Sequence, residues 1–398
     1  MGDILFLAHR APYPPDRGDK IRAFHILKHL AARRRVHLAA FADDLRDLRA
    51  KSGLYPLLAS RAIVMRRKST LRAVAEAFAS RRPASVSAFA DTAMAHAVAD
   101  VLAREPIETI YVFSSQMAQY LPATGQARVV MDFVDVDSAK FADYAAAGGL
   151  KAAVYAREAR LLLAHDRAVA ERADASLFVS EAETALFRAR TGAARVHAVE
   201  NGIDTAAFDP LARFEAVRID GPLIVFTGQM DYPPNIAAVR WFADAILPAI
   251  RAHHATARFA IVGRAPTADV RALASDAVIV TGEVPDVRGW LAAASVVVAP
   301  LKIARGIQNK VLEAMAMARP VVASAPAAEG IDHGATLRTG GDAAQLAAAV
   351  TALLDDPAAA DALGQAARAR VIARYGWDAR LAPLDALLGF TSARQVAA

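Results

Sequence analysis

The chain has 398 residues, 55% of them hydrophobic, and a formal net charge of +6. This length exceeds what one hydrophobic core usually serves, so it predicts two domains of about 200 residues each. The absence of cysteine excludes disulfide bonds, thiolate zinc sites and cysteine nucleophiles, and it fits a reducing cytoplasm.

The positive charge favours an acidic partner. Basic residues gather in the first half, at Arg33–Arg35, Arg66–Lys68 and Arg81–Arg82. Aromatic residues do not interleave with these basic clusters, which argues against nucleic acid as the partner. An anionic lipid face fits the clusters better, and the alternative is that they form an ordinary solvated surface. The N-terminus does not read as a signal peptide, and no apolar run of about 18 residues occurs. We expect a cytoplasmic protein, with peripheral contact at the inner face of the cytoplasmic membrane as a further hypothesis.

The first half alternates short apolar runs with alanine-rich amphipathic segments, and one arginine-studded helix is expected over about 138–173. The runs are typical of buried parallel strands. Six strands are expected, over 4–8, 36–41, 107–113, 129–133, 176–179 and 196–199.

A second series of strands follows, over 223–227, 259–262, 278–281, 296–299 and 321–323. Strands that alternate with helices predict an α/β protein with parallel sheets, here two Rossmann-like domains facing across a cleft. The turn-rich segment 201–222 marks the boundary. We expect an N-terminal domain over 1–212, a C-terminal nucleotide-sugar-binding domain over 213–375, and a last helix, 376–398, that packs back on the first domain.

The first strand of each half is followed by the same kind of loop. FLAHRAPYPPDRGDKIRAF and FTGQMDYPPNIAAVRWF both pass a Tyr-Pro-Pro turn and enter a helix behind Asp16 or Asn235. Proline stiffens the loop, and Asp or Asn can cap the helix. Each domain is therefore expected to aim a rigid loop and a helix start at the carboxyl edge of its sheet.

The segment that says most about function is SVVVAPLKIARGIQNKVLEAMAMARPVVAS, residues 295–324. A buried strand leads into a basic loop with Gly306, and a helix follows with Lys310 and Glu313 on one face. Lys302 and Arg305 add positive charge, so the loop and helix start predict a phosphate site. The structural alternatives are that Asn309 caps the helix, that Glu313 suits its first turn and that Lys310 is solvated.

Several motifs together resemble the glycosyltransferases of family 4, which have the GT-B fold. They are PYPPDRGDKIR, VENGIDTAAFDP, FTGQMDYPPN, IVGRAP, VTGEVPDV and GIQNKVLEAMAMARPVV, and they extend over nearly the whole chain. DFVDVDS and RGIQNKVLEAMAMARPVV look closest to the sugar transferases associated with PEP-CTERM exopolysaccharide systems.

This resemblance implies a retaining, metal-independent hexosyltransferase. It would move a sugar from a nucleotide diphosphate donor, linked to UDP or GDP, to a glycan or lipid-linked glycan in exopolysaccharide biosynthesis. No further cofactor is implied. Lysine, arginine and helix N–H groups can meet the charge of the leaving diphosphate in place of magnesium.

The resemblance assigns Glu313 to the donor ribose hydroxyls, which a carboxylate can accept in pairs. Gly18 matches the first-domain loop near the donor phosphates, and Arg264 and Val284 match positions that flank the base and phosphates. For Gly18 and Arg264 a plain turn or surface role is the alternative. The implied donor-binding set is Gly18, Gln229, Asn235, Arg264, Val284, Gly306, Ile307, Gln308, Asn309 and Glu313.

The chain also departs from the family pattern. Arg305 stands where the family has the first of two glutamates, and Gln229 and Asn235 stand where it has an arginine and a lysine. The hypothesis is that Arg305 and Lys310, with Lys302 near by, replace the lost phosphate-binding cations.

Catalysis in the family is described as front-face attack, in which the leaving phosphate can take the acceptor proton. Asp132, Asp135 and Asp137 follow the apolar run Val129–Met131, in the region where many relatives carry a histidine or aspartate near the anomeric carbon. Asp135 is the preferred group to orient or deprotonate the acceptor, with helix capping by Asp137 or Ser138 as the structural alternative. The implied catalytic set is Asp135, Arg305 and Lys310.

Two other functions remain open at this point. A nucleotide-sugar epimerase would use the same architecture, although no acid and base pair stands out. A non-catalytic nucleotide-sugar-binding module would explain the missing first glutamate. An NAD dehydrogenase is disfavoured, because GxGxxG follows neither first strand.

Overall fold

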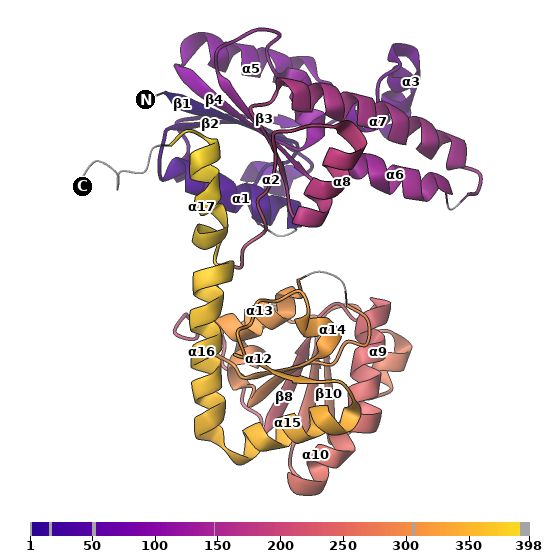
Figure 1. Cartoon of the computed structure of the whole chain (residues 1–398), viewed down its shortest axis with the longest axis vertical. Coiled ribbons are helices and arrows are strands. Elements are labelled where there is room, and N and C mark those ends of the chain that lie inside the picture. Colours follow the sequence, from indigo (N-terminus) through magenta and orange to yellow (C-terminus); the bar gives the residue numbers. More distant parts are fainter. Residues whose placement is uncertain (1, 16–17, 50–52, 147, 305–306, 391–398) are drawn as a thin grey trace. The chain divides into compact units, whose positions relative to one another are not determined.

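The computed structural model describes residues 2–15, 18–49, 53–146, 148–304 and 307–390. The chain forms two compact units (Figure 1). Residues Met1–Asn201 with Arg380–Ala398 make the first, and Gly202–Ala379 make the second. The division falls at the start of the turn-rich segment 201–222.

A parallel sheet of seven strands forms the centre of the first unit, in the order β3-β2-β1-β4-β5-β6-β7. All residues of its inner strands β1 and β2 are buried, as continuous apolar runs predict. The strands are β1 Asp3–Ala8, β2 Val36–Ala42, β3 Ser60–Met65, β4 Ile107–Phe113, β5 Arg128–Val134, β6 Ala175–Phe178 and β7 Val196–Ala198.

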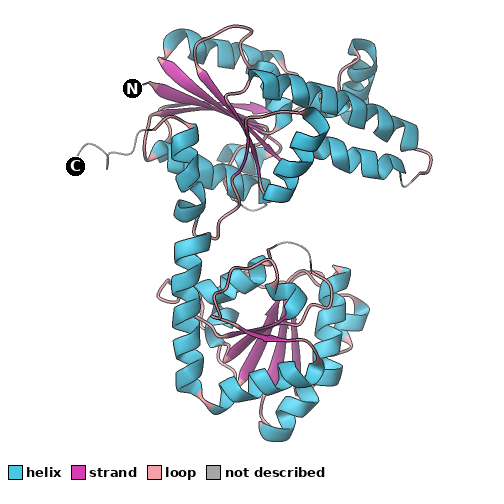
Figure 2. Cartoon of the chain, in the orientation of Figure 1, coloured by secondary structure: helices cyan, strands magenta, loops and turns pink. Residues whose placement is uncertain are grey.

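Helices flank this sheet (Figure 2). They are α1 Gly18–Ala31, α2 Leu45–Arg49, α3 Thr70–Ser80, α4 Ala84–Ser87, α5 Thr92–Arg104, α6 Asp137–Ala146, α7 Ala152–Arg172 and α8 Glu181–Thr191, with the short 3-10 helices η1 Tyr55–Leu57 and η2 Ser115–Tyr120.

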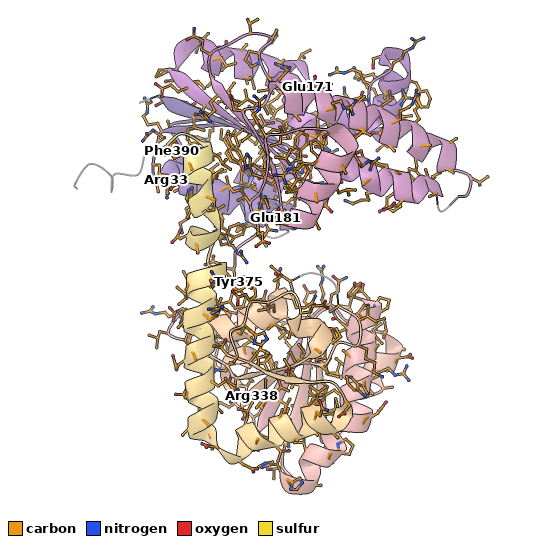
Figure 3. The ribbon with its side chains drawn as sticks, in the orientation of Figure 1. Arg33, Glu171, Glu181, Arg338, Tyr375 and Phe390 are labelled. Carbon is orange, nitrogen blue, oxygen red and sulfur yellow. The ribbon has the colours of Figure 1, made fainter. Side chains whose placement is uncertain are left out.

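The C-terminal part of helix α17 (Trp377–Leu387) belongs to the first unit and packs on α1. Asp385 lies 2.7 Å from Arg33 Nε and 2.8 Å from His29 Nε2. The Arg34 guanidinium lies over the Phe390 ring, 4.9 Å from its centroid. Figure 3 labels Phe390 and Arg33, the residue before Arg34.

The second unit has its own parallel sheet of six strands, in the order β10-β9-β8-β11-β12-β13. Its strands are β8 Leu223–Thr227, β9 Arg258–Val262, β10 Val278–Gly282, β11 Val296–Ala299, β12 Val321–Ser324 and β13 Arg338–Gly340. Its helices are α9 Pro233–Trp241, the π-helix η3 Phe242–Ile246, α10 Leu247–His253, α11 Ala268–Arg271, α12 Arg288–Ala293, α13 Asn309–Ala316, α14 Ala325–Ala328, α15 Ala343–Asp355 and α16 Pro357–Tyr375. Each sheet has a separate hydrophobic core. Two parallel sheets flanked by helices are the predicted α/β class.

The structure differs from the expected elements in three places. The single helix over 138–173 is two helices, because Gly148 and Gly149 take positive φ angles of 79° and 91° between α6 and α7. The strands β3 and β13 were not predicted, since one is a half-buried edge strand and the other has three residues.

No helix among the described residues is long and apolar enough to cross a membrane.

Candidate functional site

A cavity of about 410 Å³ opens at the carboxyl edge of the second sheet. The ends of β8, β9 and β10 and the start of α13 line it, as expected for a ligand site of an open parallel sheet. Six of the residues proposed from the sequence line this one cavity: Gln229, Asn235, Arg264, Val284, Lys310 and Glu313.

Hydrogen bonds connect four of these side chains. Lys310 Nζ donates to Asn235 Oδ1 (2.6 Å), and Asn235 Nδ2 donates to the Gln229 carbonyl (2.9 Å). Arg264 Nη2 donates to Gln229 Oε1 (3.0 Å). The sequence suggested that Asn235 caps its helix, but in the structure it does not. It is the third residue of α9 and it positions the Lys310 ammonium.

The Lys310 ammonium sits between an aromatic ring and a carboxylate. Its Nζ lies 4.2 Å from the centroid of the Phe226 ring, a cation–π distance. Burial lowers the pKa of Lys310 to about 8, and the charge of Glu313 opposes this shift. The Lys310 side chain is thus still protonated near neutral pH, although the burial of its charge costs solvation free energy.

Glu313 contributes a carboxylate that the protein leaves available. Burial raises its pKa, and Lys310 counteracts the rise. Among the described residues the carboxylate has no hydrogen-bond partner, although it lines the cavity. A buried carboxylate without donors is costly, so its acceptor capacity suits the hydroxyl groups of a ligand.

Two glycines that were not among the candidates hold this arrangement together. A Cβ on Gly228 would lie 2.8 Å from Asn235 Nδ2 and 3.0 Å from Lys310 Nζ, and one on Gly263 would lie 1.7 Å from the Gly228 carbonyl oxygen. Only glycine lets these strand ends and side chains approach so closely. The available signal was a glycine directly after an apolar strand, in FTG and in IVG.

The loop before α13 is only partly described. Arg305 and Gly306, named as site residues, lie outside the described residues. Lys302 was expected near the diphosphate, but it does not line the cavity, and its Nζ lies 4.7 Å from the Trp241 ring centroid on α9.

Ile307, Gln308 and Asn309 also stay outside the cavity lining. Gln308 precedes the first residue of α13 with extended backbone and makes no side-chain cap. Asn309, exposed, is the first residue of the helix, so it is not the cap that the structural alternative required.

The remaining candidates belong to the first unit. Gly18, exposed, begins α1, and a Cβ there would meet no atom within 4 Å. Asp135, also exposed, follows β5, and partial removal from water raises its pKa, opposed by Lys140 and reinforced by Glu183. Val134, just before it, has a φ of 73°, which a β-branched residue rarely adopts, and this turn sets the direction in which Asp135 leaves the sheet.

Asp132, of the same acidic cluster, has a structural role. It is fully buried, lies 3.0 Å from Arg22 Nη2 and accepts a hydrogen bond from the Tyr111 hydroxyl (2.9 Å). This pairing connects α1 to β5 inside the first unit. A buried ion pair of this kind serves the fold, because removal of one partner would leave the other charge uncompensated.

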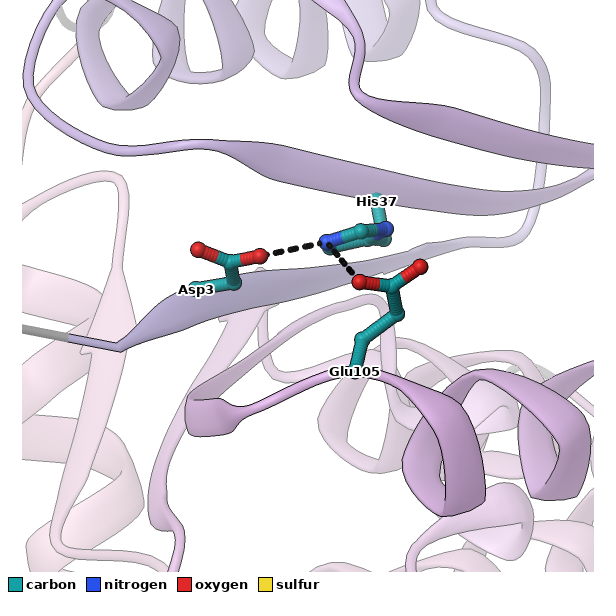
Figure 4. Close-up of side chains that lie close together, drawn as sticks. All are labelled: Asp3, His37 and Glu105. Atoms are coloured by element: carbon teal, nitrogen blue, oxygen red, sulfur yellow. Dashed lines mark hydrogen bonds and ion pairs between the residues drawn. The ribbon is translucent and has the colours of Figure 1, made fainter.

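One group of side chains in the described part of the chain has metal-ligand spacing: Asp3, His37 and Glu105 (Figure 4). His37 Nε2 lies 2.9 Å from Asp3 and 3.9 Å from Glu105. Arg35 also reaches both carboxylates, at 3.2 and 3.9 Å. The group lies where β1 and β2 begin, and ligands of such sheets bind at the opposite, carboxyl ends. Arg35 and His37 already contact both carboxylates, so we interpret the group as a structural ion-pair network.

The part of the chain that carries the cavity matches a known family. Residues 221–356 match the family model described as Glycosyl transferases group 1, so the second unit is of the group 1 glycosyltransferase type. No match to the sequence was found among curated proteins.

Solved structures show the same fold over nearly the whole chain. HepE of Anabaena in complex with UDP is 15% identical with a TM-score of 0.61, over 98% of this chain and 100% of its own. Sucrose-phosphate synthase of Thermosynechococcus elongatus is 20% identical with a TM-score of 0.60, over 99% of both chains. WaaG, a glycosyltransferase involved in lipopolysaccharide biosynthesis, is 15% identical with a TM-score of 0.56, over 97% and 100%. The GT-B fold expected from the sequence is confirmed.

Proposed function

Since its second unit is a group 1 glycosyltransferase domain, we propose that the protein transfers a sugar from a nucleotide diphosphate donor, with retention, to a glycan or lipid-linked glycan. The observation that carries this proposal is the pair of Lys310 and Glu313 in one cavity, a partly buried ammonium beside a carboxylate without hydrogen-bond partners among the described residues. One is suited to a diphosphate and the other to vicinal hydroxyls.

Each residue of the cavity then has a distinct task. Lys310 meets the charge that develops on the leaving diphosphate, and Asn235 fixes the direction of its ammonium. Glu313 accepts the ribose hydroxyls. Arg264, which is exposed and anchored by Gln229, lies at the rim, where it reaches donor phosphates or base. Lysine and arginine take the place of a metal ion in this scheme.

The finer assignments extend this proposal. HepE has been solved with UDP-glucose, at 16% identity and a TM-score of 0.57 over 98% and 100% of the two chains, which favours a UDP-linked hexose over a GDP-linked one. The likeness of DFVDVDS to PEP-CTERM-associated transferases favours an exopolysaccharide acceptor at the inner face of the cytoplasmic membrane. Asp135 is the group that we assign to the acceptor hydroxyl, and Gly18 and Arg305 remain predictions for the donor phosphates.

Nucleotide binding is the first test. Calorimetric titration of the full chain with UDP, GDP and ADP should show UDP binding that Glu313→Gln weakens, since the amide accepts fewer hydroxyl protons than a carboxylate. Glu329→Gln, an exposed change on the same unit, is the matched control and should bind as wild type does. Equal binding by Glu313→Gln and wild type would remove Glu313 from the donor site.

Turnover separates an enzyme from a binding module. Release of UDP from UDP-glucose, with water or a glycan as acceptor, is expected for the transferase and not for a module. Asp135→Asn and Arg305→Ala should each lower this rate, and full activity in either variant would exclude that residue. Formation of UDP-galactose instead of free UDP would indicate the epimerase.

A further inference from the structure

A second cavity, of about 810 Å³, opens in the first unit. Its walls lie at the carboxyl edge of the sheet, because Arg67 comes just after β3 and the helix η2 comes just after β4. Helix α5, which begins at Thr92, and one face of α3 complete the walls. Ligands of open parallel sheets bind at this edge, and the volume is within the range of ordinary small-molecule sites.

Positive charge prevails in this cavity. The described residues that line it include four cations and two carboxylates: Arg67, Lys68, Arg72, Arg82, Glu76 and Asp91. Glu76 pairs with Lys68 at 2.6 Å and with Arg72 at 2.8 Å. Asp91 caps α5, where its carboxylate accepts hydrogen bonds from two backbone N–H groups. Both carboxylates are therefore engaged within the protein.

Two guanidinium groups of the cavity have no partner of opposite charge. Arg67 and Arg82 are exposed, and neither makes an ion pair or a side-chain hydrogen bond with any residue that the structure describes. Arg67 precedes α3 and Arg82 follows it, so the two cations enter the cavity from opposite ends of this helix. Their donors are available to an anionic ligand.

The side chain of Tyr120 holds one wall of the cavity in place. Its hydroxyl accepts a hydrogen bond from the Asp91 N–H (2.9 Å) and donates one to the Phe89 carbonyl. Burial raises the pKa of Tyr120 to about 12, opposed by the hydrogen bond from Asp91 and by the charge of Arg82. The loop before α5 is thus fixed without a ligand, and the Arg82 charge acts at this wall.

Neutral polar groups in the same cavity suit sugar hydroxyls. Gln119 Nε2 donates to the carbonyls of Val86 (3.0 Å) and Gln116 (2.7 Å), which leaves Gln119 Oε1 as an acceptor that no described residue uses. Thr92, which is exposed, adds a hydroxyl at the start of α5. An amide oxygen and a hydroxyl complement the hydroxyl groups of a saccharide.

We propose, on the basis of the proposed transfer reaction, that this cavity holds an acidic sugar unit of the acceptor, one that carries a carboxylate or phosphate group. Arg67 and Arg82 bind the anionic groups, since guanidinium pairs with both kinds of oxyanion. Asp135, assigned to the reacting hydroxyl, follows β5, the strand next to β4 in the sheet. The cavity and the reacting group therefore lie at one edge, and the enzyme selects acceptors by their charge.

Direct binding of soluble sugars tests the proposal. The full chain is titrated in a calorimeter, with UDP present to fill the donor cavity. Trigalacturonate, glucose 6-phosphate or both should bind at least about tenfold more tightly than maltotriose, a neutral trisaccharide. The tighter of the two anionic probes shows whether the natural substituent is a carboxylate or a phosphate. Inorganic phosphate alone should bind more weakly than glucose 6-phosphate, because it lacks the sugar hydroxyls.

Variants assign the binding to this cavity. Arg67→Ala with Arg82→Ala should weaken the anionic probe about a hundredfold, since each charge-assisted contact contributes about tenfold. Arg67→Lys with Arg82→Lys should restore part of the affinity, because the charge returns without the planar fork. Arg104→Ala with Arg160→Ala is the matched control: both arginines are exposed on the same unit, outside the cavity lining, and the probe should bind this variant as it binds wild type. Circular dichroism and Tm check that each variant is folded.

Three results would overturn the proposal. They are equal affinity for the anionic probes and maltotriose, unchanged affinity in Arg67→Ala with Arg82→Ala, and inorganic phosphate binding as tightly as glucose 6-phosphate, which would indicate an adventitious ion only. The test needs no turnover, so it fails separately from the transfer reaction. A chain that binds UDP without preferring acidic sugars keeps the donor site and loses this one. A chain that prefers acidic sugars but binds no UDP keeps this site and loses the transfer reaction.

Discussion

At the scale of single residues, Lys310 is the group whose protonation should govern donor binding. Its pKa is lowered to about 8 by burial, so the ammonium that a diphosphate needs is lost as pH rises through this value. Bound diphosphate raises the pKa again, and binding therefore takes up a proton. Titration calorimetry with UDP between pH 7 and pH 9, in buffers of different ionisation enthalpy, should show weaker affinity and proton uptake above about pH 8.

Removal of Lys310 should abolish this pH dependence. At pH 7 we expect Lys310→Ala to weaken UDP binding about tenfold to a hundredfold, the usual loss for one charge-assisted hydrogen bond. Lys302→Ala is the matched control, because that ammonium lies over Trp241 and outside the cavity lining. Unchanged UDP affinity in Lys310→Ala would contradict the assignment of Lys310 to the diphosphate.

Asp166 gives a second residue-scale prediction, on stability. Burial in α7 raises its pKa from 3.8 to about 7, and a hydrogen bond from Ser115 Oγ opposes the rise. The folded state thus holds a proton that the unfolded state releases, and stability falls as pH rises from about 4 to about 7. Asp166→Asn copies the protonated form and should increase the free energy of unfolding at pH 8 by up to about 4 kcal/mol.

Denaturant unfolding at two pH values measures this effect. At pH 4 wild type and Asp166→Asn should be nearly equal in free energy of unfolding, and the difference between them should increase as pH approaches 8. Asp174→Asn, which changes an exposed aspartate just after α7, should leave the pH dependence of wild type intact. A constant gap at all pH values would show that Asp166 is ionised in the folded state.

At the scale of elements, the glycines at the ends of β8 and β9 should be intolerant of any side chain. A Cβ on Gly263 would overlap the Gly228 carbonyl oxygen at 1.7 Å, and the two strand ends would have to separate. We expect Gly263→Ala to cost about 1–3 kcal/mol of stability and to abolish UDP binding, because Gly228 backs both Asn235 and Lys310. Thermal unfolding and calorimetry measure the two effects. Gly341→Ala, with its nearest contact at 3.5 Å, should be nearly neutral, and tolerance at Gly263 equal to that at Gly341 would refute the packing argument.

The strands and helices differ in how well the sequence predicts them. Buried strands such as β8 and β11 are continuously apolar, and the sequence locates them to the residue. The edge strand β3 and the three-residue β13 lack that pattern, and the break between α6 and α7 rests on two glycines within an otherwise helical composition. Local patterns identify elements with one dominant environment and miss those at an edge or a bend.

The candidate site was predictable where residues share a motif. Lys310 and Glu313 are three positions apart on α13, so their common face follows from helix geometry. The role of Asn235 was missed, because its partner Lys310 is 75 positions away and only the parallel sheet brings them together. Capping is the commoner local role for Asn at a helix start, and here the long-range contact replaced it.

At the scale of the whole molecule, the two units should respond differently to donor. Each has its own sheet and hydrophobic core, so calorimetric unfolding should resolve two transitions. The described residues that line the proposed donor cavity all belong to the second unit, and a ligand stabilises the part that binds it in proportion to the logarithm of its concentration over Kd. UDP at a hundredfold excess over Kd should therefore stabilise the second unit by about 2.7 kcal/mol and leave the unfolding transition of the first unit in place.

Glu313→Gln, at the same UDP concentration, should reduce this stabilisation, and Glu329→Gln should preserve it. A single transition that UDP moves as a whole would show that the units unfold together and that nucleotide binding is coupled to both.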